Sequence, residues 1–356
     1  MFKKTVSKIL VLMLSLSMLS ACGGAEKTKN TGGEQTQAEA TNDAEDTVTV
    51  GVLSYLNMPE EDYAKLLDGR RKAMEYLKEN GVATMEGQPV TGGTVVKYYD
   101  TLDAMIMALG TGEVAMIEVP ESTADYICNQ NDNMVKYLDI DEEKADDLFT
   151  KYVIRCMSSD FSFMMNEDNS FLRDELAQKI EEMKKDGTMD AFVKQFITEA
   201  SSDEPAEAVF EEFDGKPLKF TVTGSLPPLD YVAGDGTFAG FNTAVLADIG
   251  KRMERNITLE QTDSIGRAAS LSSGASDITF WTRGFKPFDL DEKIQFERDR
   301  IEESKVNPET DEQKQIIQDL KAGLTKVQID NKDIPTGTIT TQPYFTDVNE
   351  FVSLKQ

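Results

Sequence analysis

The chain of 356 residues contains no histidine. This absence removes the most common general base, the Ser-His-Asp arrangement and the usual zinc sites. An enzyme built on this sequence would have to use carboxylates, lysine or tyrosine instead. We therefore expect no metal site and no cofactor, and catalysis by histidine is excluded.

Cysteine is scarce as well, with three in the whole chain. Beyond Cys22, Cys128 and Cys156 lie 28 positions apart and do not have the spacing of metal ligands. They could form an extracellular disulfide, or they could be two independent buried thiols. The sequence leaves both alternatives open.

Basic residues are few compared with acidic ones, with 37 lysines and arginines against 64 aspartates and glutamates. The net charge is −27, and it becomes −30 without residues 1–21, because these hold three lysines and no acid. Such a field repels phosphate backbones. We therefore expect no nucleic-acid partner.

The apolar run at 9–19 is too short for an ordinary membrane-spanning helix. It follows three lysines and precedes Leu-Ser-Ala-Cys at 19–22, a layout typical of a secretory signal. The last four residues resemble the bacterial lipobox, which implies that residues 1–21 are removed and that Cys22 carries lipid, including palmitate. The alternative is an uncleaved anchor.

Residues 22–45 are expected to form a flexible tether. After Cys22 they are rich in glycine, threonine, glutamine and acidic residues, with no apolar side chain larger than alanine. Such a segment cannot bury enough apolar surface to offset the entropy lost on ordering. A lipid, a tether and a globular body together indicate a protein held at the extracytoplasmic face of the cell membrane.

The body of the chain contains two runs of alternating strand and helix patterns. The first run comprises an expected strand at 46–56, a helix at 60–80, a strand at 94–99, and a helix, glycine turn and strand at 102–119. The second comprises a strand at 217–226, a turn and helix at 239–253, a strand at 256–262, and a helix, turn and strand at 263–281. This rhythm predicts an α/β fold of two lobes, with mostly parallel sheets flanked by helices.

We expect one lobe at 46–200, a linker at 201–216 and a second lobe at 217–356. A weak internal repeat of about 160 residues, which relates the two runs of strands and helices, supports two similar lobes. Residues 285–335 depart from the rhythm because they are charged and helix-prone. They are either a solvated helical excursion or a partner-binding arm.

A candidate ligand-binding mouth follows the strand at 217–226. Pro227-Pro228 stops the strand because proline lacks the N–H that a ladder needs. Glycines between 234 and 240 then let the chain turn back into the helix at 239–253, whose N-terminus faces the same crevice. Tyr231 either stacks on a ligand or lies at the rim.

A second candidate lies after the first expected strand. Ser54, Tyr55 and Asn57 stand where a helix N-terminus could hold an anion, or they form an ordinary loop.

Five segments resemble the type 2 periplasmic solute-binding proteins, specifically family 3, the amino-acid-binding proteins of ABC importers. Residues 224–253 are similar to the family's first-lobe opening, 271–284 to its acidic strand and Thr/Arg loop, 340–348 to its aromatic segment near the hinge, 107–127 to its second lobe, and 169–197 to its closing helix pair. The order of these segments differs from that of the family. It fits either a permuted single unit or two partial units in tandem.

The resemblance implies a zwitterionic ligand between the lobes, with a guanidinium on its carboxylate, an acid on its ammonium and an aromatic face over its side chain. It assigns the carboxylate to Arg283 beside Thr282. It assigns the ammonium to Glu118, with Glu121 as the alternative. Trp281 would stack on the ligand or fill the core.

The sequence therefore predicts a lipid-anchored protein that captures a small polar solute, foremost an amino acid, and delivers it to an ABC permease. Such a function involves no bond chemistry, so we expect no enzyme. One alternative is a surface sensor or partner-binding receptor on the same fold, with the segment 285–335 as its contact. Another is a dehydratase-type enzyme that uses Glu118 or Glu121 as proton donor.

Overall fold

One ten-stranded sheet runs through the part of the chain that the computed structural model describes. The described residues are 47–53, 59–87, 92–200, 208–263, 266–284, 310–322 and 334–355, and they belong to one compact unit. The main path of the sheet is, in order, β12 (Ile257–Gln261), β8 (Leu218–Val222), β13 (Ile278–Gly284), β7 (Ser158–Asn166), β15 (Phe345–Leu354), β4 (Met116–Pro120), β1 (Thr47–Leu53) and β3 (Gly93–Tyr99). Two short strands lie off this path: β14 (Thr338–Thr340) pairs with β7, and β5 (Met134–Lys136) pairs with β15.

At each end of the sheet the strands run parallel to one another, and helices lie between them in the sequence. At one end β1 pairs with β3 and β4, and the connecting segments form α1 (Glu60–Glu79) and α2 (Leu102–Thr111), with α3 (Glu121–Gln130) after β4. At the other end β8 pairs with β12 and β13, and the helices are α7 (Phe241–Met253) and α8 (Gly266–Ser273). We call these the β1 side and the β8 side. The expected α/β fold and its two runs of strands and helices are confirmed.

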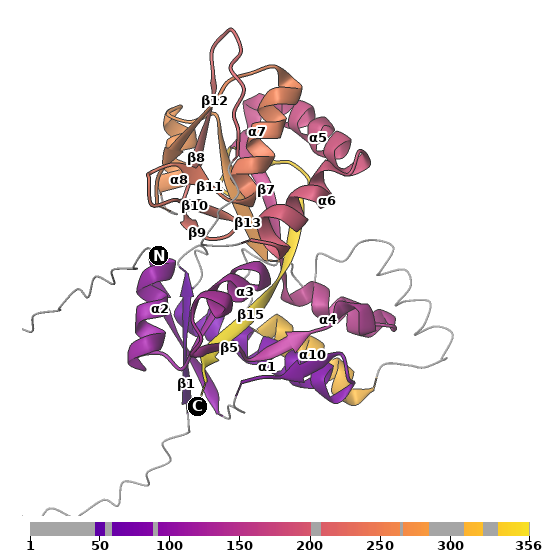
Figure 1. The fold of residues 1–356 in the computed structure, drawn as a ribbon. Helices are drawn as coiled ribbons and strands as arrows, with labels where there is room; N and C mark the ends of the chain where they lie inside the picture. The colour runs from indigo at the N-terminus through magenta and orange to yellow at the C-terminus, as the bar shows by residue number, and fades with distance from the viewer. Residues whose placement is uncertain are drawn as a thin grey trace, which may run out of the picture. The chain divides into compact units, whose positions relative to one another are not determined.

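The centre of the sheet is antiparallel, unlike its ends. β7 pairs with β15, with Phe161 opposite Phe345, and the two strands continue into opposite sides of the sheet. β7 goes on to pair with β13, and β15 goes on to pair with β4. Figure 1 shows β15, in yellow, running between the β8 side and the β1 side. Strands from both sides therefore share one sheet.

Two helices after β7 confirm the expected helix pair at 169–197. They are α5 (Ser170–Lys185) and α6 (Thr188–Val193), and both contact α7 on the β8 side. β7, α5 and α6 precede residue 201, yet they pack with strands and helices that follow it. The expected lobe boundaries themselves stay a prediction.

Local sequence explains how the chain reaches the end of β4. Thr101 caps the N-terminus of α2, because its hydroxyl accepts a hydrogen bond from the Ala104 N–H at 3.2 Å. Gly112 ends the helix with φ of 74°, in the left-handed region that glycine adopts without strain. The strand that follows is buried along its whole length, and Pro120 is both its last residue and the residue before α3.

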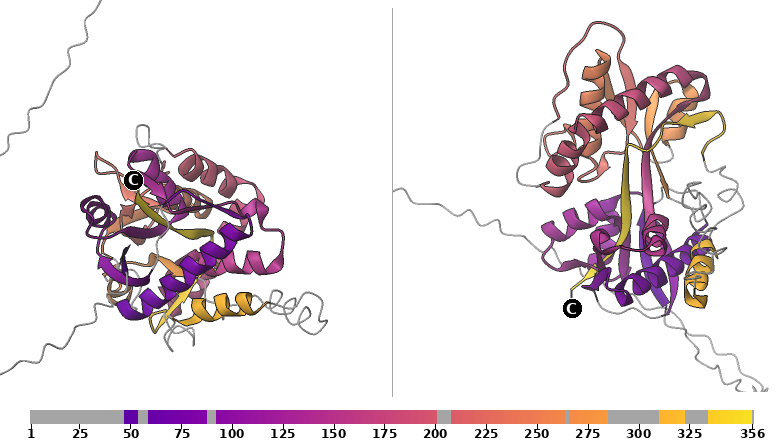
Figure 2. Two further views of the ribbon diagram at one scale, coloured as in Figure 1. Left: turned by 90° about the horizontal axis from the view of Figure 1, so that it is seen from below. Right: turned by 90° about the vertical axis from the view of Figure 1, so that its right-hand side faces the viewer.

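A helix from the charged segment 285–335 packs on α1. This helix, α10 (Asp311–Ala322), buries its apolar residues Ile316, Ile317 and Leu320. Gly69 of α1 permits the close approach, because a Cβ there would lie 2.5 Å from the carbonyl oxygen of Asp319. Figures 1 and 2 both show α10 beside α1, although the two helices are far apart in the sequence. Apart from Thr310, the other residues from 285 to 333 lie outside the described residues.

Smaller elements complete the described chain. They are β2 (Ala83–Met85), β6 (Leu138–Ile140), β9 (Ser225–Leu226), β10 (Asp230–Val232), β11 (Phe238–Ala239), α4 (Leu148–Met157), two 3₁₀ turns, η1 (Glu142–Lys144) and η2 (Glu167–Asn169), and a short π-helix, η3 (Lys194–Thr198). β9, β10 and β11 form a separate three-stranded sheet at the expected mouth.

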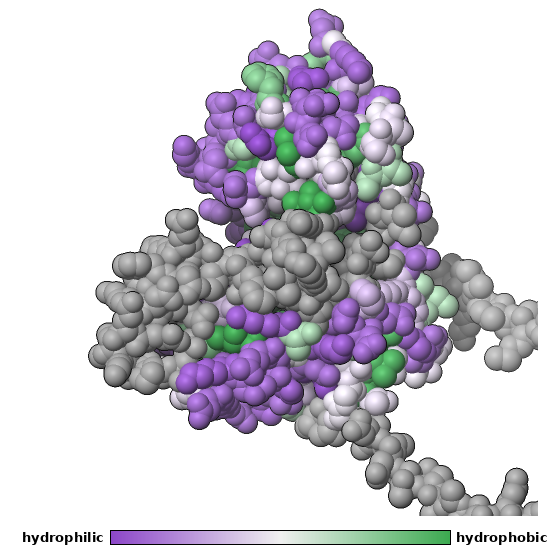
Figure 3. Space-filling model, turned by 180° about the vertical axis from the view of Figure 1, so that it is seen from behind, coloured by the Kyte–Doolittle hydropathy of each residue, from purple (hydrophilic) through white to green (hydrophobic). Residues whose placement is uncertain are grey.

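The described residues have two clusters of buried apolar side chains. One joins α1, α4 and α10 to the β1 side, and the other runs from α2 and α3 into the β8 side. Figure 3 shows that the described surface on one face is largely hydrophilic, with hydrophobic residues scattered over it. Polar side chains thus dominate the described surface on this face.

Candidate functional site

A pocket of about 60 Å³ opens at the carboxyl ends of β1 and β4. Strand order reverses here, because β1 leads to β3 on one flank and to β4 on the other. Ligands of open α/β sheets bind at such a point. The lining residues are Val52, Leu53, Tyr63, Arg70, Glu118, Val119, Pro120, Ser159, Phe161, Leu226, Thr282 and Asn349.

Two of the lining residues, Arg70 and Glu118, form a buried ion pair. Arg70 Nη1 donates to Glu118 Oε1, and the Tyr63 hydroxyl donates to Glu118 Oε2 at 2.6 Å. Both charged side chains are 4% exposed. Tyr63 and Arg70 lie seven positions apart on α1, which is two turns and places them on one face. Arg70 Nε is buried and donates no hydrogen bond to the described residues.

Burial and the charge of Glu118 oppose each other in setting the pKa of Arg70, but both raise the pKa of Tyr63. Burial would lower the pKa of Arg70, but the attraction of Glu118 outweighs it, so the pKa is raised. Burial, followed by the negative charge of Glu118, holds the pKa of Tyr63 well above its usual value. Tyr63 is therefore a neutral donor, and the pair keeps one positive and one negative group at the wall of the pocket.

Two of the predicted site residues line this pocket, Glu118 and Thr282. Trp281 and Arg283 flank Thr282 on β13, and side chains alternate along a strand, so the neighbours point to the other face of the sheet. The Trp281 ring instead lies 5.7 Å from the Arg267 guanidinium carbon. Their role in ligand binding stays a prediction.

The remaining predicted residues lie elsewhere. Ser54, Tyr55 and Asn57 lie outside the described residues, although they follow Leu53, which lines the pocket. Tyr231 lies on β10, with its ring centre 6.5 Å from that of Tyr126 on α3. This aromatic contact joins the β8 side to the β1 side.

Glu121 lines a second pocket, of about 410 Å³. Burial raises the pKa of Glu121 to about 7, although Lys136, 3.6 Å away, opposes the shift. Asp347 lines the same pocket, and burial raises its pKa to about 6 despite hydrogen bonds from Ser122 N and Oγ. Carboxyl groups thus line the second pocket, whereas the first pocket is lined by an ion pair of opposite charges.

Sequence reasoning missed Arg70 and Tyr63. The expected helix at 60–80 had apolar positions at Leu66, Leu67 and Met74, and Arg70 lies three or four residues from each of them. A charged residue on an apolar helix face was the available signal, since such a charge needs a buried partner. That the partner is Glu118, 48 positions away, follows from the tertiary fold.

Three further features of the described residues concern membrane-spanning helices, metal-binding clusters and cysteines. The helices among them lack a segment long and apolar enough to span a membrane. In the same residues no cluster of three acids and thiols could hold a metal ion. Cys128 and Cys156 do not form a disulfide with each other, and burial raises the pKa of Cys128 to about 11.

No protein-family profile and no curated protein matches the chain. Among solved structures, it is similar to a probable amino-acid ABC transporter extracellular-binding protein from Bacillus subtilis, at 10% identity and a TM-score of 0.35, over 87% of this chain and 84% of that one. A putative L-cystine ABC transporter from Listeria monocytogenes aligns at 10% identity and a TM-score of 0.31, over 87% and 83%.

The ligand-binding component of an ABC-type import system from Staphylococcus aureus, with zinc bound, aligns at 7% identity and a TM-score of 0.35. The alignment covers 86% of this chain but 65% of that protein, so this chain spans less than two thirds of its length. These values are too low to transfer a ligand or a residue role.

Proposed function

We propose that this protein is an extracytoplasmic solute-binding protein of an ABC importer, which captures a small polar solute of amino-acid type in the Arg70–Glu118 pocket. The buried ion pair carries the proposal. Both side chains are almost inaccessible to solvent, yet both line a cavity with room for several water-sized groups.

A buried ion pair contributes little to the stability of a fold. Removing two charges from water costs several kcal/mol per ion, and apolar residues of the same volume often stabilise a fold as well or better. A pair at the wall of a pocket has another use. Arg70 offers an Nε–H to a ligand carboxylate, and Glu118 offers its oxygens to an ammonium group.

Residues from both the β1 side and the β8 side line the pocket. The charged groups come from α1 and β4, whereas Thr282 comes from β13 and Leu226 from β9. β7 and β15 join the two sides, so a ligand that contacts both favours the conformation in which they meet. Binding without bond chemistry is the function that such an arrangement serves.

The importer assignment rests on the sequence. The signal at 1–21, lipid on Cys22 and the tether at 22–45 would hold the body at the outer face of the membrane, beside a permease. The amino-acid class of the solute rests on the resemblance and on the paired charges.

Thermal unfolding of residues 44–356 with a panel of amino acids, small peptides and organic acids tests the proposal. A ligand at a hundred times its dissociation constant stabilises the folded state by about 2.7 kcal/mol. We expect amino acids to raise the midpoint, and Thr282→Val, which removes one hydroxyl from the pocket wall, to reduce the rise.

Thr258→Val on β12, outside the pocket, is the matched control and should leave the rise unchanged. If no compound in the panel shifted the midpoint, the amino-acid receptor would be the wrong function. If both variants responded equally, the ligand would bind away from Thr282.

A further inference from the structure

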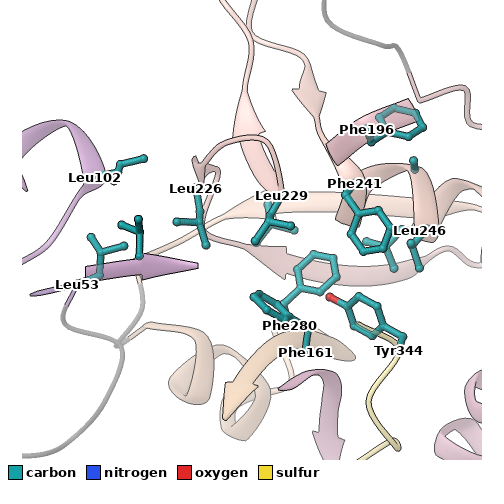
Figure 4. Packing of buried hydrophobic residues seen from close by; sticks show 14 of the residues in the cluster. Leu53, Leu102, Phe161, Phe196, Leu226, Leu229, Phe241, Leu246, Phe280 and Tyr344 are labelled. Atoms are coloured by element: carbon teal, nitrogen blue, oxygen red, sulfur yellow. The ribbon is translucent and has the colours of Figure 1, made fainter. Parts of the chain in front are cut away.

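Leu226 contributes an apolar side chain to the pocket that Arg70 and Glu118 also line. It lies on β9, in the small sheet that is separate from the ten-stranded one, and it is 6% exposed. Leu53, from the β1 side, lines the same pocket. Figure 4 shows Leu226 between Leu53 and Leu229, and all three belong to one apolar cluster. Leu226 thus closes the pocket from the β8 side.

The turn behind Leu226 is held firmly. Asp230 Oδ2 accepts hydrogen bonds from Thr223 N and Oγ1, both at 3.0 Å, and from Gly224 N at 3.3 Å. At the start of α7, Phe241 N donates to Pro228 O at 3.0 Å and Asn242 N donates to Leu229 O at 2.8 Å. Backbone and side-chain bonds on both flanks therefore fix the position of Leu226.

Gly240 permits this attachment. Its φ is 103°, and a Cβ there would lie 2.5 Å from Pro228 O. The turn that begins with the proline pair is therefore hydrogen-bonded to the start of α7, and Leu226 directly precedes this turn.

We propose that Leu226 sets the size limit of the solute, so that compact amino acids are accepted and longer side chains are rejected. This inference rests on the proposed function, because it takes the charged groups of the solute to lie at Arg70 and Glu118. Apolar side chains, among them Leu226, Leu53 and Phe161, also line the pocket and are available to the side chain of the solute. A cavity of about 60 Å³ leaves little room beyond the polar head of an amino acid.

Calorimetric binding to residues 44–356 tests the size limit with an unbranched series: glycine, alanine, 2-aminobutyrate, norvaline and norleucine. We expect the unsubstituted chain to bind the shorter members and Leu226→Ala to improve norleucine relative to alanine by about 10-fold or more, the scale of discrimination by methylenes in an apolar pocket. Leu226→Phe should weaken the longest member that the unsubstituted chain accepts.

Leu246→Ala is the matched control. Leu246 is a fully buried leucine of α7 that does not line the pocket, so its truncation removes a similar apolar contact without enlarging the site. It should keep the original order of affinities. If Leu226→Ala does not fold, the loss caused by Leu226→Phe carries the test.

Two results would overturn the inference while the proposed function stands. One is that the unsubstituted chain binds norleucine as tightly as alanine. The other is that the Leu226 variants keep the original affinity ratios. If no variant and no unsubstituted chain binds any member of the series, the size limit fails together with the proposed amino-acid function.

Discussion

Glu118 and Glu121 lie three positions apart, at the end of β4 and the start of α3, but their surroundings differ. Glu118 is almost fully buried and is bonded to Arg70 and Tyr63. Glu121 is less buried, its nearest cation is Lys136 at 3.6 Å, and Lys136 also pairs with Asp125 and Asp139. Burial raises the pKa of Glu121 because Lys136, which Glu121 shares with two other acids, only partly offsets the loss of water, whereas Glu118 is bonded directly to the guanidinium of Arg70.

The largest effect should come from dividing the Arg70–Glu118 pair. We expect Arg70→Met to lower the free energy of unfolding by about 3 to 5 kcal/mol, because it leaves Glu118 buried without its cation. The double variant Arg70→Met with Glu118→Leu should recover most of this loss, since neither charge remains. Urea denaturation measures both.

The double variant also separates stability from binding. It should fold and yet bind no solute in the calorimetric assay, because both charged groups of the site are gone. If the double variant were as unstable as the single one, the loss of stability would not come from an unpaired buried charge. If it bound solute normally, the solute would not bind to Arg70 and Glu118.

A smaller effect is expected at Ser122, which follows Glu121. Its backbone N–H and hydroxyl both donate to Asp347. Ser122→Ala removes the hydroxyl and should cost about 1 to 2 kcal/mol at pH 8, where Asp347 is charged. The cost should shrink at pH 5, because the pKa of Asp347 is about 6.

Urea denaturation at the two pH values tests this expectation. Ser158→Ala is the control, since its hydroxyl is also buried but donates to the Ile154 carbonyl and to no carboxylate. An equal pH dependence in the two variants would contradict the account of Asp347.

The smallest effect concerns the charge state of Glu121. Its pKa is about 7 in the folded state against an ordinary value of 4.5, so the folded protein binds more protons than the unfolded chain between these values. Stability from this group is present below pH 4.5 and is lost as pH rises toward and through 7.

We therefore expect Glu121→Gln to raise the thermal midpoint by about 2 to 4 °C at pH 8 and to change it little at pH 4.5. Glu142→Gln, an exposed change in the lining of the same pocket, should have no such pH dependence. A Glu121→Gln midpoint that follows the unsubstituted chain at every pH would disprove the shift.

The sequence predicted regular elements well where local signals were strong. The expected helix at 60–80 is α1, and the helix, turn and strand at 102–119 are α2, Gly112 and β4. The turn at 227–240 was recognised because proline and glycine act locally. β7 was missed, since a buried run such as Phe-Ser-Phe-Met-Met does not by itself distinguish strand from helix.

The site was predicted less completely, for two physical reasons. Arg70 reaches Glu118 because β1 lies between β3 and β4 in the sheet. This strand order cannot be predicted from local sequence patterns. Thr282 lines the pocket without Trp281 and Arg283, because alternation along β13 sends neighbours to opposite faces. Adjacent residues in a motif need not share a site.

The place of β15 has a consequence for how this chain comes to be assembled. β15 follows every other described strand in the chain, yet it lies in the middle of the sheet, between β7 and β4. Until β15 has been synthesised, both neighbours present open edges, which are templates for wrong pairing. The order of synthesis thus opposes the order of the sheet, and the sheet is continuous only once β15 has joined it.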